Sequence, residues 1–151
     1  MYKIMFVCHG NICRSPMAEF VFKKMISDRH LDGKYHVASC ATSTEEIGNP
    51  VYPPARAELK KHGISCDGKH AVQLKRSDYQ LYDLFVCMDS RNLSNMLRIF
   101  ESDPENKTRK LMDYTPRGGD VADPWYTDRF DVTYRDVCLG CEALLNALEN
   151  E

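Results

Sequence analysis

The residues of this sequence best placed to do chemistry are two cysteines and an arginine in the stretch FVCHGNICRSPMAEF near the N-terminus. Cys8 follows a short apolar run, and Arg14 stands six positions after it. A guanidinium is a forked donor that matches two phosphate oxygens, and a cysteine thiolate is a strong nucleophile. The stretch therefore predicts a nucleophile beside a binding site for a phosphate group.

This pair needs a loop that leaves a buried strand and enters a helix. The run from Tyr2 to Val7 is apolar at nearly every residue, which is typical of a parallel strand covered on both faces. A turn is expected at His9 to Asn11, and Ser15 is predicted to cap a helix in which Pro16 takes the first position. Free backbone N–H groups of the loop and the helix dipole can then bind an anion and favour the thiolate.

The rest of the periodicity predicts strands that alternate with helices. Besides the helix after Pro16, the segments with helical spacing are a short one closed by Gly63, 93–100 and 130–148. Strands are predicted at 35–41 and 84–88, with a weaker candidate at 109–112. This alternation predicts a three-layer α/β fold with a parallel sheet and helices on both faces, in which ligands bind beyond the carboxyl ends of the strands.

Length and composition limit the class of protein. The 151 residues, 43% of them hydrophobic, predict a single domain that spans residues 1–151. A formal charge of -2 and a short N-terminal apolar run favour neither nucleic acid nor a membrane as partner, and a cytoplasmic protein is expected. Seven cysteines suit a reducing compartment, and Cys138 and Cys141 lie on an apolar helix stripe, so neither a metal nor a cofactor is expected.

The segment VCHGNICRSPMAE resembles the signature of low molecular weight protein tyrosine phosphatases. The segments SCATSTEEIGNP, LKKHGI, FVCMDSRNL and ADPWY extend the resemblance over nearly the whole chain, in the family's order. It implies a Rossmann-like low-molecular-weight phosphatase fold with a four-stranded parallel sheet. It further implies hydrolysis of phosphotyrosine through a cysteinyl-phosphate, with Cys8 as nucleophile, Arg14 as transition-state clamp and Asp123 as general acid.

The resemblance also implies how the reactive cysteine is surrounded. Ser15 would donate to the thiolate, and Asn11, tied to Ser39 and His70, would hold the loop in a strained shape. Compared with the family's pattern, two extra residues precede His70 in this sequence, in CDGKH. Together with Cys8 and Arg14, the residues expected in the phosphate-binding loop are His9, Gly10, Asn11, Ile12, Cys13 and Ser15.

A departing phenolate needs a proton, so a carboxylic acid must stand opposite the nucleophile. From the residues alone, four aspartates in one segment qualify: Asp113, Asp120, Asp123 and Asp128. The resemblance selects Asp123. The neighbouring Trp125 and Tyr126 are expected to form walls for a flat phenyl ring. A deep aromatic slot favours phosphotyrosine over phosphoserine.

Glu45 and Glu46 stand where family members often carry an aromatic residue at the pocket rim. Two carboxylates at the entrance would oppose the approach of a dianionic phosphotyrosine with acidic neighbours. The expected substrates are therefore phosphotyrosine proteins with neutral or basic flanking residues, or small aryl phosphates, with inorganic phosphate as product. The alternative is that both glutamates only keep a loop hydrated.

Three other functions fit the same loop. Arsenate reductases of this fold relay oxidation through cysteines near the position of Cys87, but Ser94 stands seven residues beyond it. A phosphate-binding module without turnover would lack the nucleophile or the acid. Arginine phosphatases of the family tend to carry threonine at the position of Ile12 and lack the aromatic pair, so the sequence favours phosphotyrosine.

Cys13 lies five positions from Cys8 on the same tight loop. A thiolate is easily oxidised, and a second thiol nearby can trap the sulfenic acid as a disulfide before irreversible oxidation. The sequence thus predicts a redox-sensitive enzyme in which Cys13 protects Cys8. The alternative role for Cys13 is packing alone.

Overall fold

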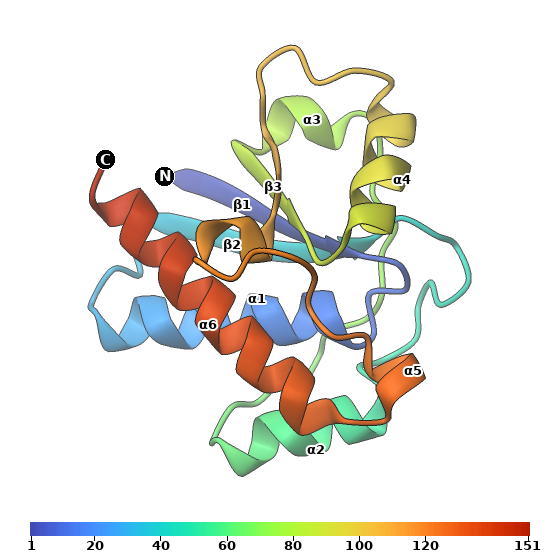
Figure 1. Cartoon of the computed structure of the whole chain (residues 1–151), viewed down its shortest axis with the longest axis vertical. Helices are drawn as coiled ribbons and strands as arrows, with labels where there is room; N and C mark the ends of the chain where they lie inside the picture. Colours follow the sequence, from blue (N-terminus) through green and yellow to red (C-terminus); the bar gives the residue numbers. More distant parts are fainter.

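The computed structural model describes all 151 residues and contains one parallel sheet between two layers of helices (Figure 1). The strands, in spatial order β2-β1-β3-β4, are β1 (Tyr2–Cys8), β2 (Tyr35–Ala41), β3 (Leu84–Cys87) and β4 (Thr108–Lys110). The helices are α1 (Arg14–Asp28), α2 (Pro53–Lys61), α3 (Asp78–Leu81), α4 (Ser90–Phe100), α5 (Pro124–Thr127) and α6 (Phe130–Glu149), with a 3₁₀ helix at η1 (Leu111–Tyr114). The predicted α/β fold with four parallel strands is confirmed.

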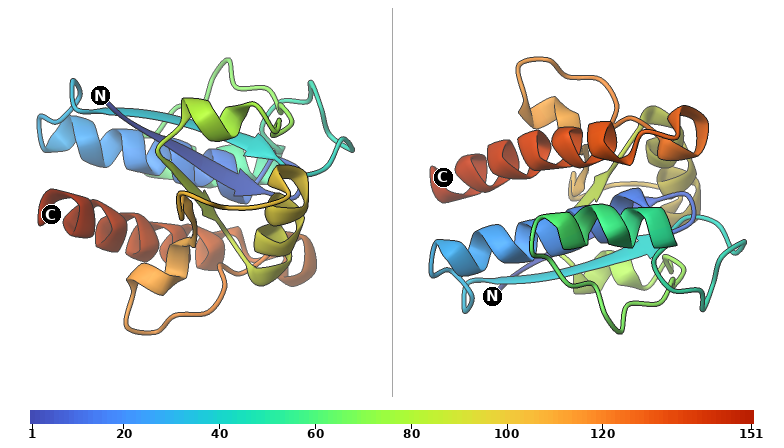
Figure 2. Two further views of the ribbon diagram at one scale, coloured as in Figure 1. Left: turned by 90° about the horizontal axis from the view of Figure 1, so that it is seen from above. Right: turned by 90° about the horizontal axis from the view of Figure 1, so that it is seen from below.

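Side chains of β1 alternate between the two faces of the sheet, which explains why the strand is apolar throughout. Ile4 and Phe6 belong to the larger core cluster, which includes side chains of α1 and α6. Met5 and Val7 belong to a smaller cluster with side chains of α3 and α4. Figures 1 and 2 show the same division, with α1, α2 and α6 on one face and α3 and α4 on the other.

The direction of strand order reverses between β1 and β3. The chain runs outward from β1 to β2 and then returns to build β3 and β4 on the other side of β1. In parallel sheets of this kind, the crevice at the carboxyl ends of the strands around the reversal is the usual ligand site. Since β1 ends at Cys8, the loop that carries Cys8 and Arg14 lies at this crevice.

The structure corrects the predicted start of α1. The helix begins at Arg14 after Cys13, whose side chain makes no capping hydrogen bond, so Ser15 lies inside the first turn and the prediction that Ser15 is the N-cap is wrong. The reason is that free N–H groups at this end point at the Cys8 sulfur instead of at a capping hydroxyl. The N–H of Ser15 lies 3.4 Å from Cys8 Sγ.

Two further boundaries differ from the sequence prediction. The segment 109–112 was expected to be a strand, but β4 ends at Lys110 and the buried Leu111 and Met112 belong to the 3₁₀ helix η1. The helix predicted from residue 93 begins at Ser90, because Asp89 and Asn92 form a capping box.

All seven cysteines are free thiols in the structure. Cys141 is fully buried and Cys138 is half-buried, both within or against the larger core cluster, as expected for a packing role. None of the helices has the length and apolar character that crossing a membrane requires.

Gly140 on α6 allows the helix to approach η1 closely. A Cβ at this position would lie 2.8 Å from Cδ2 of Leu111, which is fully buried and can shift only if neighbouring core side chains shift with it. Overpacking of this kind costs about 1–3 kcal/mol, which exceeds the gain of up to about 1 kcal/mol in helix propensity when alanine replaces glycine. We therefore expect Gly140→Ala to lower the free energy of unfolding by about 1–2 kcal/mol.

Urea unfolding of Gly140→Ala beside Gly33→Ala tests this prediction. Gly33 has open space around its Cα and no positive φ, so alanine there is expected to be neutral or slightly stabilising. An unchanged or raised midpoint for Gly140→Ala would show that Leu111 repacks without cost.

Candidate active site

The loop between β1 and α1 folds around the sulfur of Cys8. The backbone N–H of Asn11 lies 3.3 Å from Cys8 Sγ, and the hydroxyl of Ser15 lies 3.0 Å from it. With the N–H of Ser15, three polar groups therefore converge on one buried sulfur atom. When the cysteine is a thiolate, all three can donate to it, which stabilises the negative charge.

Asn11 holds this loop in an unusual backbone conformation. Its φ is +59°, in the left-handed region that non-glycine residues rarely adopt, and its side chain is fully buried. Its Nδ2 donates to Ser15 Oγ at 2.7 Å and to Ser39 Oγ at 3.0 Å, and its Oδ1 accepts from the N–H of Val72 at 3.2 Å. The predicted bond between Asn11 and Ser39 is present.

The other six cysteines are poorer candidates for a nucleophile. Burial raises the pKa of each of these thiols: Cys13, Cys40, Cys66, Cys87, Cys138 and Cys141. For Cys13, burial and the charge of Cys8 raise the pKa to about 12. Those six side chains therefore remain thiols near neutral pH, and the thiolate is the reactive form.

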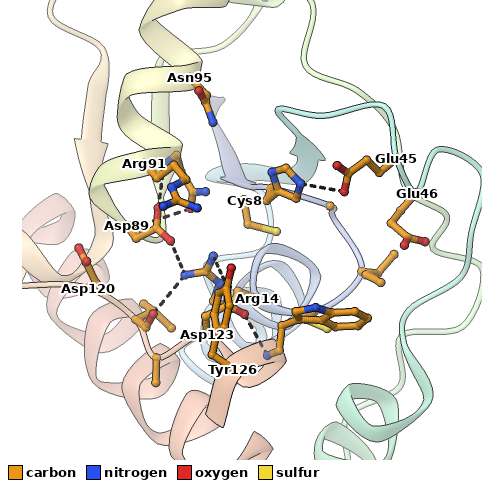
Figure 3. Close-up of a pocket in the computed structure, with 18 of the residues that line it drawn as sticks. Cys8, Arg14, Glu45, Glu46, Asp89, Arg91, Asn95, Asp120, Asp123 and Tyr126 are labelled. Atoms are coloured by element: carbon orange, nitrogen blue, oxygen red, sulfur yellow. Dashed lines mark hydrogen bonds and ion pairs between the residues drawn. The ribbon is translucent and has the colours of Figure 1, made fainter. Parts of the chain in front are cut away.

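Arg14 is buried and lies between two carboxylates (Figure 3). Its guanidinium lies 2.9 Å from Oδ2 of Asp89 and 3.5 Å from Oδ2 of Asp123, and it also donates to the carbonyl of Val121. Burial lowers the pKa of Arg14, but the negative charges of Cys8, Asp123 and Asp89 raise it overall. The guanidinium thus stays charged beside Cys8, where it can bind an incoming phosphate group.

Of the four candidate acids, Asp123 alone contacts Arg14. Asp120 also lines the cavity but pairs with Lys110 at 2.9 Å, whereas Asp113 and Asp128 do not line it. Asp123 is half-buried, and its Oδ1 accepts from the N–H of Trp125 at 3.0 Å as the N-cap of α5. This cap holds the carboxylate at the cavity wall.

A cavity of about 760 Å³ opens above Cys8. Ile12, Trp125 and Tyr126 provide its large apolar side chains, and the two aromatic residues are 66% and 78% exposed. Trp125 packs against Tyr52 with ring centroids 5.8 Å apart. The predicted aromatic pair therefore lies at the mouth of the cavity that contains the cysteine.

Both rim glutamates also line this cavity. Oε2 of Glu45 lies 2.9 Å from Nε2 of His9, and Oε2 of Glu46 accepts from Nδ2 of Asn49 at 2.6 Å. Figure 3 shows the two carboxylates on one side of Cys8. The structure thus places them at the rim rather than in a distant loop.

His70 does not support the loop, so that expectation is wrong. The residue is exposed, its Nδ1 lies 3.1 Å from the carbonyl oxygen of Gly68, and it has no contact with Asn11. The neighbouring Lys69 reaches the buried network instead. Nζ of Lys69 donates to the carbonyl of Ser39 at 2.8 Å.

Glu19 completes this network from α1. Its Oε1 accepts from Ser39 Oγ at 2.5 Å and lies 3.7 Å from Nζ of Lys69, while its Oε2 binds Nζ of Lys23 at 2.6 Å. A continuous path of polar contacts therefore joins Lys69 and Glu19 through Ser39 to Asn11, the residue with the strained backbone.

Comparison with known proteins gives a consistent result. The sequence matches the family described as low molecular weight phosphotyrosine protein phosphatase over residues 3–151. The low molecular weight protein-tyrosine-phosphatase YfkJ of Bacillus subtilis is 34% identical, and the alignment covers 100% of this chain and 98% of that protein. The corresponding phosphatase of Gallus gallus is 38% identical, with coverage of 94% and 92%. This chain belongs to that family.

Solved structures of related phosphatases have the same fold. The crystal structure of YfkJ from Bacillus subtilis superposes with a TM-score of 0.96 over 99% of this chain and 96% of that chain, at 34% identity. The protein tyrosine phosphatase from Entamoeba histolytica, with Hepes in the active site, gives a TM-score of 0.91 at 31% identity, with coverage of 99% and 98%. The resemblance seen in the sequence is confirmed.

Sequence reasoning missed three residues of this phosphatase site: Asp89, Glu19 and Lys69. Asp89 carried a signal, since it follows a strand at the carboxyl edge of the sheet and precedes a helix, the usual place of a ligand-binding or capping side chain. Glu19 and Lys69 carried none, because a glutamate in a helix and a lysine in a loop are most often on the surface.

We expect Lys69→Met to destabilise this phosphatase by about 1–3 kcal/mol, since it leaves the nearly buried Glu19 with fewer partners. Burial lowers the pKa of Lys69, and the charge of Glu19 opposes this shift, so Glu19 favours the charged ammonium. Lys23→Met is the matched control, because the Lys23 side chain binds the same carboxylate but is 45% exposed, so water can replace its ammonium, and an i,i+4 pair on a helix contributes only about 0.2–0.5 kcal/mol.

Urea unfolding and the kcat for an aryl phosphate are measured for Lys69→Met, Lys23→Met and His70→Ala. Only the first is expected to lose both stability and kcat, because it alone reaches the strained loop. Equal losses in the two lysine variants, or a larger loss in His70→Ala, would contradict this assignment.

Proposed function

We propose that this protein hydrolyses phosphotyrosine in proteins, and small aryl phosphates, to inorganic phosphate through a cysteinyl-phosphate intermediate on Cys8. The observation that carries the proposal is the placement of the sulfur, Arg14 and Asp123 around one cavity with aromatic walls. Each of the three performs a different part of the reaction. The seven free cysteines support a reducing, cytoplasmic location as part of the same proposal.

In the first step, the Cys8 thiolate attacks the phosphorus atom, the S–P bond forms and the bond from phosphorus to the phenolic oxygen breaks. The free N–H groups of the loop and the guanidinium of Arg14 bind the phosphoryl oxygens, which carry the developing charge. Asp123, as the carboxylic acid, gives its proton to the departing phenolate.

In the second step, water attacks the phosphorus atom of the cysteinyl-phosphate. Asp123, now a carboxylate, takes a proton from this water, and the S–P bond breaks to release inorganic phosphate and the thiolate. The contacts from Asn11 and Ser15 stabilise the leaving thiolate as they stabilise the nucleophile. One cysteine and one aspartate thus serve both steps.

The aromatic wall supports phosphotyrosine as the substrate. The sulfur is buried below a rim that includes Ile12, Trp125 and Tyr126, so the phosphorus atom must be carried down to it on a long, flat group. A phenyl ring meets this requirement, whereas the short side chain of phosphoserine does not.

An arsenate reductase requires further cysteines that relay oxidation to the surface. Cys87, the last residue of β3, is fully buried, and burial with the charge of Asp89 raises its pKa to about 12. This environment supports a packing role for Cys87 and favours the phosphatase over the reductase.

One set of assays tests the proposal. Wild type and Cys8→Ser are given phosphotyrosine, phosphoserine and phosphoarginine peptides, and arsenate with a thiol reductant. Phosphate release from phosphotyrosine by the wild type alone is the expected result. Faster turnover of phosphoarginine or arsenate would show that phosphotyrosine is not the preferred substrate. Absence of turnover with every compound would indicate a phosphate-binding module instead of an enzyme.

Cys13 is expected to protect the proposed enzyme from irreversible oxidation. Peroxide converts the Cys8 thiolate to an uncharged sulfenic acid, which removes the negative charge that helps to raise the pKa of Cys13. The Cys13 sulfur then loses its proton and attacks the Cys8 sulfur, so that water leaves and a disulfide forms. Dithiothreitol reduces the disulfide to the two thiols. After peroxide and then dithiothreitol, wild type should regain most of its activity and Cys13→Ser a several-fold smaller fraction.

Each variant is normalised to its own activity before peroxide. Cys138→Ser serves as the control, because Cys138 is also half-buried but lies on α6. It should recover as the wild type does. Equal recovery in Cys13→Ser and wild type would assign Cys13 to packing alone.

A further inference from the structure

The charged residues that line the cavity are divided between two sides. Glu45 and Glu46 lie on one side of Cys8, in the loop between β2 and α2, and Arg91 and Asn95 lie on the opposite side, on α4 (Figure 3). Arg91 and Asn95 are one helical turn apart, so they face the cavity together. The cavity therefore extends beyond the phosphate-binding loop in two directions of different charge.

Arg91 is the cation of this cavity without a carboxylate partner. It is exposed and takes part in none of the ion pairs of the structure, whereas Arg14 is bound by Asp89 and Arg117 lies 3.6 Å from Asp136. Asp120, the other acid on this side, is bound to Lys110 at 2.9 Å. The acidic groups near Arg91 are thus already neutralised, and its guanidinium is free for a ligand.

Asn95 adds donors beside Arg91. Its Oδ1 accepts from Arg98 at 3.4 Å, while its Nδ2 makes no hydrogen bond within the protein. A carboxylate placed between these two side chains would accept from the guanidinium and from the amide. The same group on the opposite side would meet Glu45 and Glu46, whose charges repel it.

We propose that Arg91 and Asn95 form a subsite for an acidic side chain on one flank of the phosphotyrosine, while Glu45 and Glu46 disfavour an acidic side chain on the other flank. The proposal rests on the proposed phosphatase function and names the substrate class more closely. The enzyme should then distinguish a peptide with acidic residues before the phosphotyrosine from one with acidic residues after it. The sequence alone predicts a preference for neutral or basic residues on both flanks of the phosphotyrosine. The proposed subsite limits this preference to the flank that faces Glu45 and Glu46.

The test uses four substrates. Two are phosphotyrosine peptides, one with acidic residues only before the phosphotyrosine and one with acidic residues only after it. The others are a neutral phosphotyrosine peptide and a small aryl phosphate. The proteins are the wild type, Arg91→Gln, the double variant Glu45→Gln with Glu46→Gln, and Arg135→Gln. Arg135 is exposed on α6, lies outside the cavity and forms no ion pair, so its replacement controls for net charge. Each kcat/KM is divided by that for the small aryl phosphate.

The wild type is expected to prefer one acidic peptide. Arg91→Gln should lower the relative kcat/KM of that peptide by about 2- to 5-fold, the size expected for an exposed ion pair. The double variant should raise the relative value of the other acidic peptide by a similar factor. Both effects should shrink as salt rises, because exposed charges are screened within about 10 Å at 0.1 M.

Two results would overturn the subsite. One is an equal fall for both acidic peptides in Arg91→Gln, and the other is a response no larger than that of Arg135→Gln. In either case the wild type still hydrolyses the aryl phosphate, so the proposed function stands. Absence of turnover with all four substrates would instead remove the proposed function and the subsite together.

Discussion

Replacement of Cys8 by serine is expected to lower phosphatase turnover by about 10⁴-fold or more, to the level of a blank, because the nucleophile is lost. A serine hydroxyl needs a neighbouring general base to become a nucleophile. The groups within hydrogen-bonding distance of the Cys8 sulfur are the N–H of Asn11 and the N–H and hydroxyl of Ser15, and these stabilise an anion but do not take up a proton from a hydroxyl. The site can therefore use a thiolate and cannot activate serine.

Phosphate binding is expected to survive in Cys8→Ser, since Arg14 and the loop N–H groups remain. Trp125 is the single tryptophan of the chain and lines the cavity, so its fluorescence reports the titration with inorganic phosphate. Cys138→Ser, with its substitution on α6, should bind phosphate and turn over substrate as the wild type does. Turnover by Cys8→Ser above that of a blank preparation would contradict the assignment of the nucleophile.

The parts of this site that could be predicted from sequence are those with local signals. The apolar run of β1 has one physical cause, burial on both faces, and the next residues must form a loop because a helix follows at once. The positions of Cys8 and Arg14 at the carboxyl edge of the sheet follow from this order alone. The choice of Asp123 among four aspartates needed the resemblance, since an acid in a loop carries no periodic signal.

The parts that could not be predicted depend on partners far away in the chain. Lys69 reaches the site from a distant part of the sequence, since its contact with Ser39 spans 30 positions. Asp89 holds Arg14 across 75 positions. The predicted capping role of Ser15 failed for a related reason, because the sulfur at the end of β1 takes the place of a cap.

Asp123 is the site of the second large effect, a fall in kcat of about 10²- to 10⁴-fold on replacement by asparagine. An amide cannot give a proton to the leaving phenolate. The loss should therefore be larger for aryl phosphates whose phenols are more basic, since their departure depends more on protonation. A series of substituted phenyl phosphates measures this dependence.

The choice of asparagine keeps the local structure. Asp123 Oδ1 caps α5 through the N–H of Trp125, and asparagine is an equally good N-cap residue. Alanine removes the cap as well and should also disturb KM, because the cap positions the aromatic wall. We expect Asp123→Asn and Asp123→Ala to have a similarly low kcat, and only Asp123→Ala to have a raised KM. This result would assign the fall in kcat to the lost acid and the change in KM to the lost cap.

Binding should change in the opposite sense from turnover in Asp123→Asn. The carboxylate of Asp123 lies 3.5 Å from the guanidinium of Arg14 and adds a negative charge next to the site of a dianion. Its neutralisation frees Arg14 and removes this repulsion, so KM and the inhibition constant for inorganic phosphate should fall or stay constant while kcat drops. Asp120→Asn is the control, because Asp120 lines the same cavity but pairs with Lys110. If Asp120→Asn lost kcat and Asp123→Asn kept it, the two acids would exchange roles.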